Sequence, residues 1–315
     1  MKITKPGIYP GIDEAAYYAD PCPLPSLTQS ICKVLLDQSP AHARIAHPRL
    51  APPTAADDDD DDEPAEKYDK AKAIGNAAHK LMIGRGKDVE VIDASNFRGA
   101  QAKAKRDAAV AAGKTPVLAH HFGEAVHIVE AGKRQLAVAG LADVFADGSG
   151  EVCVAAEDGI WMRALVDWMV SPVMLIDYKT TGASFAPHTI ALKIESDGWD
   201  IQAAMQERIL DLIDPDNAGR RTFRFIAQEN YEPYALVPVE LTEHWLTMGR
   251  KKLAHAEKVW RWCMHHDVWP AYPPELLRPD YPQYREAAWL KREVEESERP
   301  LPRRREPMLT DLAGG

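Results

Sequence analysis

The stretch that most constrains the fold of this chain is Met162–Thr181, which reads MRALVDWMVSPVMLIDYKTT. It consists of two short apolar runs joined at Ser171-Pro172, a break typical of the turn in a β-hairpin. Side chains two apart on a strand point to the same face, so Asp177 and Lys179 share one face. Asp167 of the first run then lies across from the neighbourhood of Asp177, and cross-strand Cβ atoms are roughly 4.5–5.5 Å apart. The pattern predicts two carboxylates and one ammonium group together, within runs that otherwise look buried.

Such a group of charges needs a partner when it is buried. Two ionised carboxylates at this distance repel each other, and burying them without a counter-charge is costly. A divalent cation such as Mg²⁺ or Mn²⁺ resolves the conflict, because these ions prefer hard oxygen ligands. The alternative is that Asp177 and Lys179 form an ordinary ion pair at a strand end. The preceding Asp167 and the following Thr180 and Thr181 favour the metal site.

The segments RALVD and IDYKTT resemble the core of the PD-(D/E)xK nucleases, and more narrowly their RecE-like (exodeoxyribonuclease VIII) branch, common in phages. The segments LPSLTQSICKVLLDQSPAH, GNAAHKLM and WDIQAAM also match this family. The resemblance runs, with gaps, from about Gly7 to Trp289. It implies an α/β fold with a restriction-endonuclease-like core, in which a central mixed β-sheet carries the hairpin and is flanked by helices.

The resemblance also implies roles for the hairpin residues. A metal ion would be held by Asp167 and Asp177, assisted by His79 and the carbonyl group of Tyr178. Lys179 would orient the attacking water or stabilise the developing negative charge. The implied reaction is the metal-dependent hydrolysis of phosphodiester bonds from duplex DNA ends, in the 5′→3′ direction, for phage-type recombination.

Other candidates lie outside the hairpin. Residues 68–84 are predicted to form a helix, and a lone histidine on its apolar face is usually a packed core residue. The match to the family's G-x-x-x-H helix instead favours His79 as a metal ligand. Glu151 stands where the family has a glutamate, and would be a ligand, a neighbour of the ligands or a group that positions water. Gln202 matches the glutamine of a Q-x-x-x-Y motif and is counted with the catalytic residues, whereas Gln206 stands at the tyrosine position.

Arg163, Thr180, Thr181 and Gln202 are expected to contact DNA. A guanidinium group binds phosphate through two parallel hydrogen bonds, which favours Arg163 for this role. Val166 stands where relatives have a proline, a difference that touches no catalytic group.

Hydrophobic periodicity and capping residues predict the remaining elements. Helices are expected at 26–39, 100–113, 116–131 (stopped by Gly132), 199–213 and 241–266. Strands are expected at 136–144, 151–154, 223–228 and 234–239.

The 315 residues, 45% of them hydrophobic, fit one large domain or two small ones. A single nuclease domain is expected over 1–290, with an acidic flexible loop at about 50–67 and a charged, disordered tail over 291–315. The net charge is −10, but Asp57–Glu63 contributes seven negative charges, which leaves about −3 elsewhere. This balance argues against a broadly basic surface and still permits a local positive channel. A second hypothesis is that the acidic run mimics DNA phosphates in that channel.

The cysteines are scattered along the chain without a C-x-x-C pair, so a structural zinc site is not expected. Some related nucleases hold an iron–sulfur cluster with one upstream and three clustered downstream cysteines. That triplet is absent here, so no iron–sulfur cluster is expected. No apolar run approaches the roughly 18 residues of a membrane span, and the N-terminus lacks the apolar core of a signal peptide. The expected location is the cytoplasm of a bacterial host cell, with no membrane partner.

By the same resemblance, the expected partners are double-stranded DNA ends, further copies of the chain in a homo-oligomeric ring, and a phage single-strand annealing protein. Two alternatives stay open. One is a nuclease of the same chemistry with a repair or endonuclease task. The other is a DNA-end-binding protein whose site is catalytically degenerate, which the missing tyrosine and the acidic net charge support.

Overall fold

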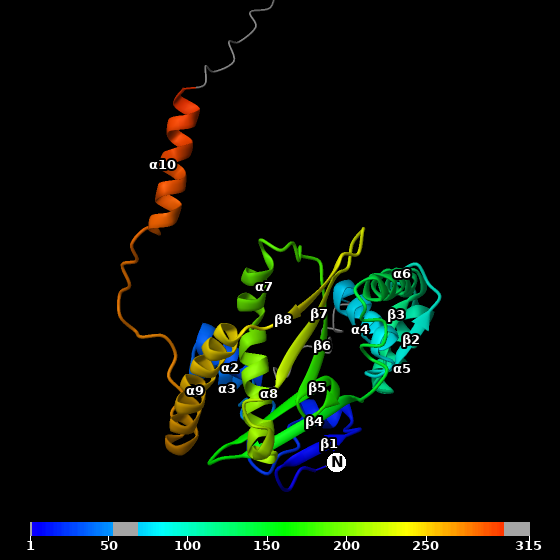
Figure 1. The fold of residues 1–315 in the computed structure, drawn as a ribbon, viewed down its shortest axis with the longest axis horizontal. Helices are drawn as coiled ribbons and strands as arrows, with labels where there is room; N and C mark the ends of the chain where they lie inside the picture. The colour runs from blue at the N-terminus through cyan, green and yellow to red at the C-terminus, as the bar shows by residue number, and fades with distance from the viewer. Residues whose placement is uncertain (1, 53–68, 299–315) are drawn as a thin grey trace, which may run out of the picture. The chain divides into compact units, whose positions relative to one another are not determined.

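The computed structural model describes residues 2–52 and 69–298, so the run Asp57–Glu63 and the last residues of the expected tail lie outside the described residues. The chain divides into two units, Met1–Ala271 and Tyr272–Gly315. The first unit is built on a six-stranded mixed sheet with strand order β1-β4-β5-β6-β7-β8 (Figure 1). The strands are β1 (Gly7–Pro10), β4 (Ser149–Glu157), β5 (Trp161–Ser171), β6 (Met174–Thr181), β7 (Thr222–Glu229) and β8 (Leu236–Glu240).

Helices cover both faces of this sheet (Figure 1). One face packs against α2 (Gln29–Asp37), α8 (Trp199–Ile213) and α9 (Glu243–His266), and the buried side chains there form the largest core cluster. The other face packs against α4 (Lys70–Ile83) and α6 (Ala119–Val138). The structure therefore confirms the expected α/β class, with a central mixed sheet flanked by helices.

Smaller elements complete the first unit. They are α1 (Glu14–Tyr18), α3 (Pro40–Ala46), α5 (Ala100–Ala111), α7 (Ile190–Asp197) and the 3₁₀ turn η1 (Pro215–Asn217). A two-stranded parallel sheet, β2 (Val89–Ile92) with β3 (Thr115–Leu118), lies beside α5. None of the helices in the described ranges is long and apolar enough to span a membrane.

The predicted hairpin forms from β5 and β6, with its turn one residue later than expected. Ser171 pairs with Met174, so the loop consists of Pro172 and Val173. On β5 the register shifts between Met169 and Ser171, which marks a bulge just before the turn. Further along, Trp168 pairs with Ile176. The next step of this register places Asp167 beside Asp177, as the hairpin pattern predicted.

The strand β6 also pairs with β7 in parallel, with Asp177 opposite Phe225. A parallel pair needs a crossover connection. The chain supplies it with α7 and α8 between the two strands. This crossover brings α8, with its Gln202, over the strand that carries Asp177.

Two predictions around α6 were wrong. The helix does not stop at Gly132 but runs to Val138, and the expected strand over 136–144 is the end of this helix followed by turns. A Cβ atom at Gly132 would lie 2.5 Å from Gln228 Oε1 and 2.8 Å from Met82 Cε. The glycine therefore serves the close approach of α6 to its neighbours rather than the end of the helix.

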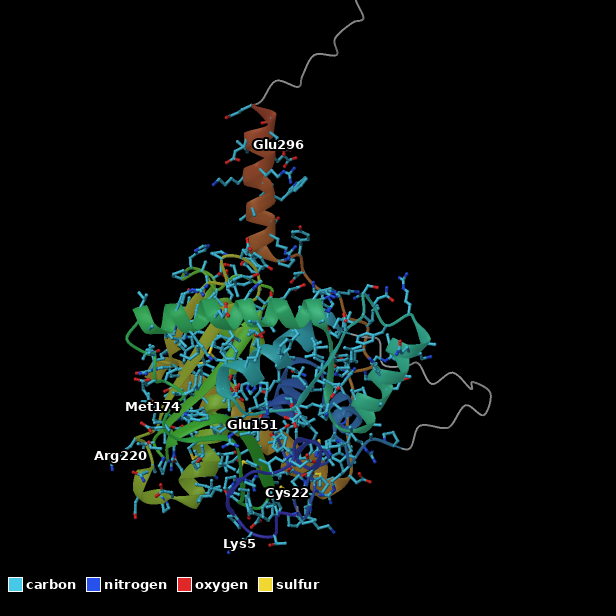
Figure 2. All side chains as sticks on the ribbon, turned by 90° about the vertical axis from the view of Figure 1, so that its right-hand side faces the viewer. Lys5, Cys22, Glu151, Met174, Arg220 and Glu296 are labelled. Atoms are coloured by element: carbon cyan, nitrogen blue, oxygen red, sulfur yellow. The ribbon has the colours of Figure 1, made fainter. Side chains whose placement is uncertain are left out.

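The second unit begins at Tyr272, within the range 1–290 that was expected to form one domain. Its helix α10 spans Gln283–Ser297 and thus includes the first residues of the expected tail. None of its residues is buried, and its side chains extend from all around the helix (Figure 2). Opposite charges at i, i+4 positions, such as Arg292 and Glu296, suit a helix exposed on all faces.

Candidate active site

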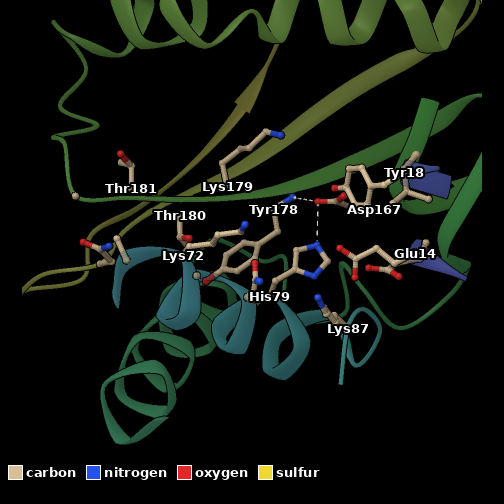
Figure 3. A pocket seen from close by; sticks show the side chains of 17 residues that line it. Glu14, Tyr18, Lys72, His79, Lys87, Asp167, Tyr178, Lys179, Thr180 and Thr181 are labelled. Carbon is tan, nitrogen blue, oxygen red and sulfur yellow. Dashed lines mark hydrogen bonds and ion pairs between the residues drawn. The ribbon is translucent and has the colours of Figure 1, made fainter. Parts of the chain in front are cut away.

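A cavity of about 540 Å³ opens between α4 and the strands β5 and β6 (Figure 3). Helix α4 begins at Lys70, where the Asp69 side chain accepts a hydrogen bond from the amide of Lys72. The helix lies close to β6, because a Cβ atom at Gly75 would be 3.2 Å from Thr180 Oγ1. The cavity is lined by several of the residues predicted from the sequence: His79, Glu151, Asp167, Tyr178, Lys179, Thr180 and Thr181.

Three acidic residues occupy matching positions on three adjacent strands. In the β4–β5 pairing, Gly150 pairs with Trp168 and Val152 with Val166, so the residue between them, Glu151, stands opposite Asp167. Asp167 in turn is next to Asp177 in the β5–β6 register. Glu151 has a positive φ of 51° and is labelled in Figure 2. The antiparallel register thus brings together the carboxylates of Glu151, Asp167 and Asp177, which lie within 26 residues of one another in the sequence.

Asp167 is held by two donors on the same oxygen. His79 Nε2 lies 3.2 Å from Asp167 Oδ2, and the amide of Tyr178 donates to this oxygen at 3.1 Å. Burial lowers the pKa of His79, but the hydrogen bond and the charge of Asp167 outweigh this effect and raise it. Burial raises the pKa of Asp167, but the hydrogen bond to His79 and the charges of His79 and Lys179 outweigh it and lower the pKa.

Asp177 has its own partners. Lys179 Nζ lies 2.7 Å from Asp177 Oδ1, and Gln202 of α8 donates through Nε2 to Asp177 Oδ2. Burial and the neighbouring charge of Asp167 raise the pKa of Asp177 despite these contacts. Burial lowers the pKa of Lys179, but the charges of Asp177 and Asp167 raise it overall. Lys179 therefore stays cationic, whereas the two aspartates cannot both ionise without cost.

The donor types fit a hard divalent cation. Asp167 and His79 line the cavity, and Asp177 is buried on the adjacent strand β6. A cation between Asp167 and Asp177 would replace the repulsion that raises the pKa of Asp177. Within residues 2–52 and 69–298, however, no group of three or more His, Cys, Asp or Glu side chains is arranged to hold a metal ion. The groups are paired with protein partners instead: His79 with Asp167, and Asp177 with Lys179 and Gln202. Binding of an ion would require these pairs to open.

The predicted DNA contact of Arg163 was wrong. Arg163 lies on the same strand as Asp167, but its side chain is 4% exposed and is not part of the cavity wall. Its Nη1 atom lies 3.0 Å from Asp20 Oδ1, and its Nε atom donates to the carbonyl of Tyr17 at 3.2 Å. The N-terminal segment covers this end of the strand, so the guanidinium group has protein partners where phosphate was expected.

Gln202 and Gln206 are explained by the packing of α8. Gln202 contacts the carboxylate of Asp177, so its amide group orients that carboxylate. Gln206, at the position of the motif tyrosine, is buried and donates through Nε2 to the carbonyl of Leu165 at 3.3 Å. This residue ties α8 to β5. Tyr178 is also buried, and its hydroxyl donates to Gln228 Oε1 at 2.7 Å.

The sequence reasoning did not single out Glu14, Tyr18, Lys72 and Lys87, which also line the cavity. Lys72 is seven residues before His79 on α4, so it falls on the same face after two turns, and this spacing was a usable signal. Lys87 follows the helix in a loop, and Glu14 and Tyr18 come from α1, which only the fold brings to the cavity. No local pattern pointed to these three residues.

No family model and no curated protein matches this chain. Among solved structures, the chain is similar to the crystal structure of a protein from Eubacterium rectale described as a "putative exonuclease". The TM-score is 0.50 at 12% sequence identity, and the match covers 92% of this chain and 94% of that chain. At this identity the similarity shows the fold alone, so this chain shares the α/β fold of that protein. It does not single out the RecE-like branch.

Proposed function

We propose that this protein is a metal-dependent nuclease that hydrolyses phosphodiester bonds at the ends of duplex DNA. The observation that carries the proposal is the grouping of Asp167, Asp177 and Lys179 on two adjacent strands, with His79 in the same cavity. This is the donor set needed to bind a hard cation and to place an ammonium group beside a phosphate. The nuclease-like fold supports the same conclusion.

Each of these residues has a role in the proposed mechanism. Asp167, Asp177 and His79, with the carbonyl of Tyr178, would hold Mg²⁺, for which Mn²⁺ would substitute. The bound ion would polarise the phosphate and lower the pKa of a water molecule. Lys179 would orient the attacking water or stabilise the negative charge that develops on the phosphate. Glu151 stands opposite Asp167 and is suited to accept a proton or to orient water, since burial raises its pKa.

The rest of the cavity suits a DNA backbone. Lys72 and Lys87 are exposed and place positive charge on the α4 side of the cavity. Thr180 and Thr181 place hydroxyl groups at the end of β6. Lysine and threonine side chains are common donors to phosphate oxygens. A local positive wall of this kind is compatible with a net charge of −10.

The finer proposals rest on the resemblance to the RecE-like nucleases. We propose digestion in the 5′→3′ direction for phage-type recombination, assembly into a homo-oligomeric ring, and cooperation with a single-strand annealing protein in the cytoplasm of a bacterial host. The absence of an iron–sulfur cluster stays a prediction. The cysteines Cys22, Cys32, Cys153 and Cys263 are free thiols, and all are buried.

The proposal is tested by incubating the purified protein with end-labelled linear duplex DNA, with and without Mg²⁺. We expect loss of the label and progressive shortening only when Mg²⁺ is present. A covalently closed circle of the same sequence should survive, and its cleavage would indicate an endonuclease instead. Binding of linear DNA without cleavage in Mg²⁺ or Mn²⁺ would indicate a DNA-end-binding protein with a degenerate site, and would refute the proposal.

A further inference from the structure

Tyr18 is an aromatic residue that is exposed beside the candidate catalytic groups. It lines the same cavity as Asp167 and His79, yet 60% of its surface is accessible. Figure 3 shows its ring next to Asp167, on the side of the cavity that also holds Glu14 and Lys87. Burying a large aromatic side chain is favourable, so an exposed ring at the wall of a cavity is a surface available to a ligand.

The ring is held in place by buried interactions behind it. Tyr18 ends the helix α1, whose first turn is capped by the side chain of Asp13. The adjacent Tyr17 is buried, its ring meets that of Tyr18 edge to face at 5.3 Å, and its carbonyl accepts a hydrogen bond from Arg163. Arg163 is in turn paired with the buried Asp20. Arg163 thus acts as a positioning residue for the segment that carries Tyr18.

The two ends of the cavity differ in charge. Thr180 and Lys72 lie at the end away from Tyr18 (Figure 3). At the Tyr18 end, Glu14 places a negative charge, with Lys87 as the nearby cation (Figure 3). Glu151, opposite Asp167 on the neighbouring strand, adds a second negative charge to the cavity wall. A continuing row of phosphates fits the end with Lys72 better than it fits this end.

We infer that Tyr18 stacks on the base of the nucleotide next to the bond that is cut, and so holds the end of the DNA strand in the cavity. This inference rests on the proposed nuclease function. A neutral, planar base suits an exposed aromatic ring at an acidic end, where a further phosphate would be repelled. Stacking between a base and an aromatic side chain tolerates any sequence, because every base has a flat face.

The test compares Tyr18→Leu and Tyr18→Phe with the unaltered protein. Leucine removes the ring, whereas phenylalanine keeps it and removes only the hydroxyl. A matched control is Trp262→Leu, which removes an aromatic ring that is 47% exposed on α9, outside the cavity. DNA affinity is measured without divalent cation on a linear duplex carrying 2-aminopurine at its terminal position, and kcat/KM for cleavage is measured with Mg²⁺. Thermal unfolding checks that each variant is folded.

Stacking of one base on an aromatic ring is worth about 1–3 kcal/mol. We therefore expect Tyr18→Leu to weaken terminal binding by about 5- to 150-fold and to leave the 2-aminopurine fluorescence unquenched. Tyr18→Phe and Trp262→Leu should stay within about twofold of the unaltered protein. If Tyr18→Leu binds the DNA end as tightly as the unaltered protein and quenches 2-aminopurine as strongly, the inference about Tyr18 is overturned. The proposed nuclease function would still hold in that case, provided that the unaltered protein cuts the DNA. Equal losses in Tyr18→Phe and Tyr18→Leu would also overturn the inference about Tyr18, because the hydroxyl would then be the essential group. If the unaltered protein neither binds nor cuts linear DNA, both proposals are wrong.

Discussion

Replacing Lys179 with alanine should remove most DNA cleavage and leave DNA binding in place. The Lys179 ammonium group lies 2.7 Å from Asp177 Oδ1, at the edge of the cavity that holds Asp167. The charges of these two aspartates overcome the effect of burial and keep the pKa of Lys179 above its usual value. The group is therefore charged throughout the working pH range and is held where a phosphate would approach.

The size of the effect follows from the distance. At 2.7 Å, two unit charges attract by about 1.5 kcal/mol in bulk water and by about 6 kcal/mol at an effective dielectric constant of 20. Much of this energy in the resting protein is offset by desolvation of the two groups, so the loss of folding stability should be smaller. The attraction between Lys179 and the negative charge that develops on a phosphate at a similar distance is not offset by desolvation in this way. Removing one preorganised donor of this kind costs on the order of 10²–10³ in rate.

The assay is single-turnover cleavage of end-labelled linear duplex DNA, with DNA affinity measured in parallel. Lys179→Arg keeps the charge but changes the shape of the donor, and should recover only part of the rate. Lys114→Ala is the control, because Lys114 forms a comparable 2.8 Å pair with Glu90 at the small β2–β3 sheet, outside the cavity. A Lys179→Ala variant that cuts within tenfold of the unaltered rate would refute the reasoning.

Further predictions concern the metal site, the buried ion pair and the packing of α6. Asp177→Asn should abolish Mn²⁺ binding in calorimetry, since an amide cannot supply the anionic charge, and unchanged affinity would exclude the proposed site. Burial raises the pKa of Asp20, but hydrogen bonds and the charge of Arg163 outweigh this effect and lower the pKa below the usual 3.8. The ionised Asp20 therefore stabilises the fold at neutral pH, and this contribution is lost as the pH falls below 3.8. Asp20→Asn should therefore cost about 3–5 kcal/mol at pH 7 and progressively less in acid, as denaturant unfolding at several pH values would show. Gly132→Ala should cost about 1–3 kcal/mol in the same assay, because the added Cβ would lie 2.5 Å from Gln228 Oε1, and an unchanged midpoint would contradict the packing argument.

The hairpin and its charges could be predicted because they depend on local rules. Side chains alternate along a strand, so a turn near Pro172 is enough to bring Asp167 and Asp177 together and to place Lys179 on the face of Asp177. The helix around His79 could be predicted from its apolar spacing and from Gly84, which ends it in the left-handed conformation with a φ of 73°. In both cases the pattern and the contacts it specifies lie within about 20 residues.

The tertiary structure alone decided the features that depend on distant parts of the chain. Arg163 was predicted to bind phosphate, but a guanidinium group binds any suitable acceptor, and the fold supplies Asp20 from a segment 143 residues earlier. The same segment places Tyr18 at the cavity, although nothing in its local sequence indicates this position. In the sequence, Gly132 predicts the end of a helix. In the structure, it is the point where the helix comes close to Gln228. Periodicity is a property of neighbouring residues, whereas the partner that a buried charge or a small residue meets is settled only when the elements pack together.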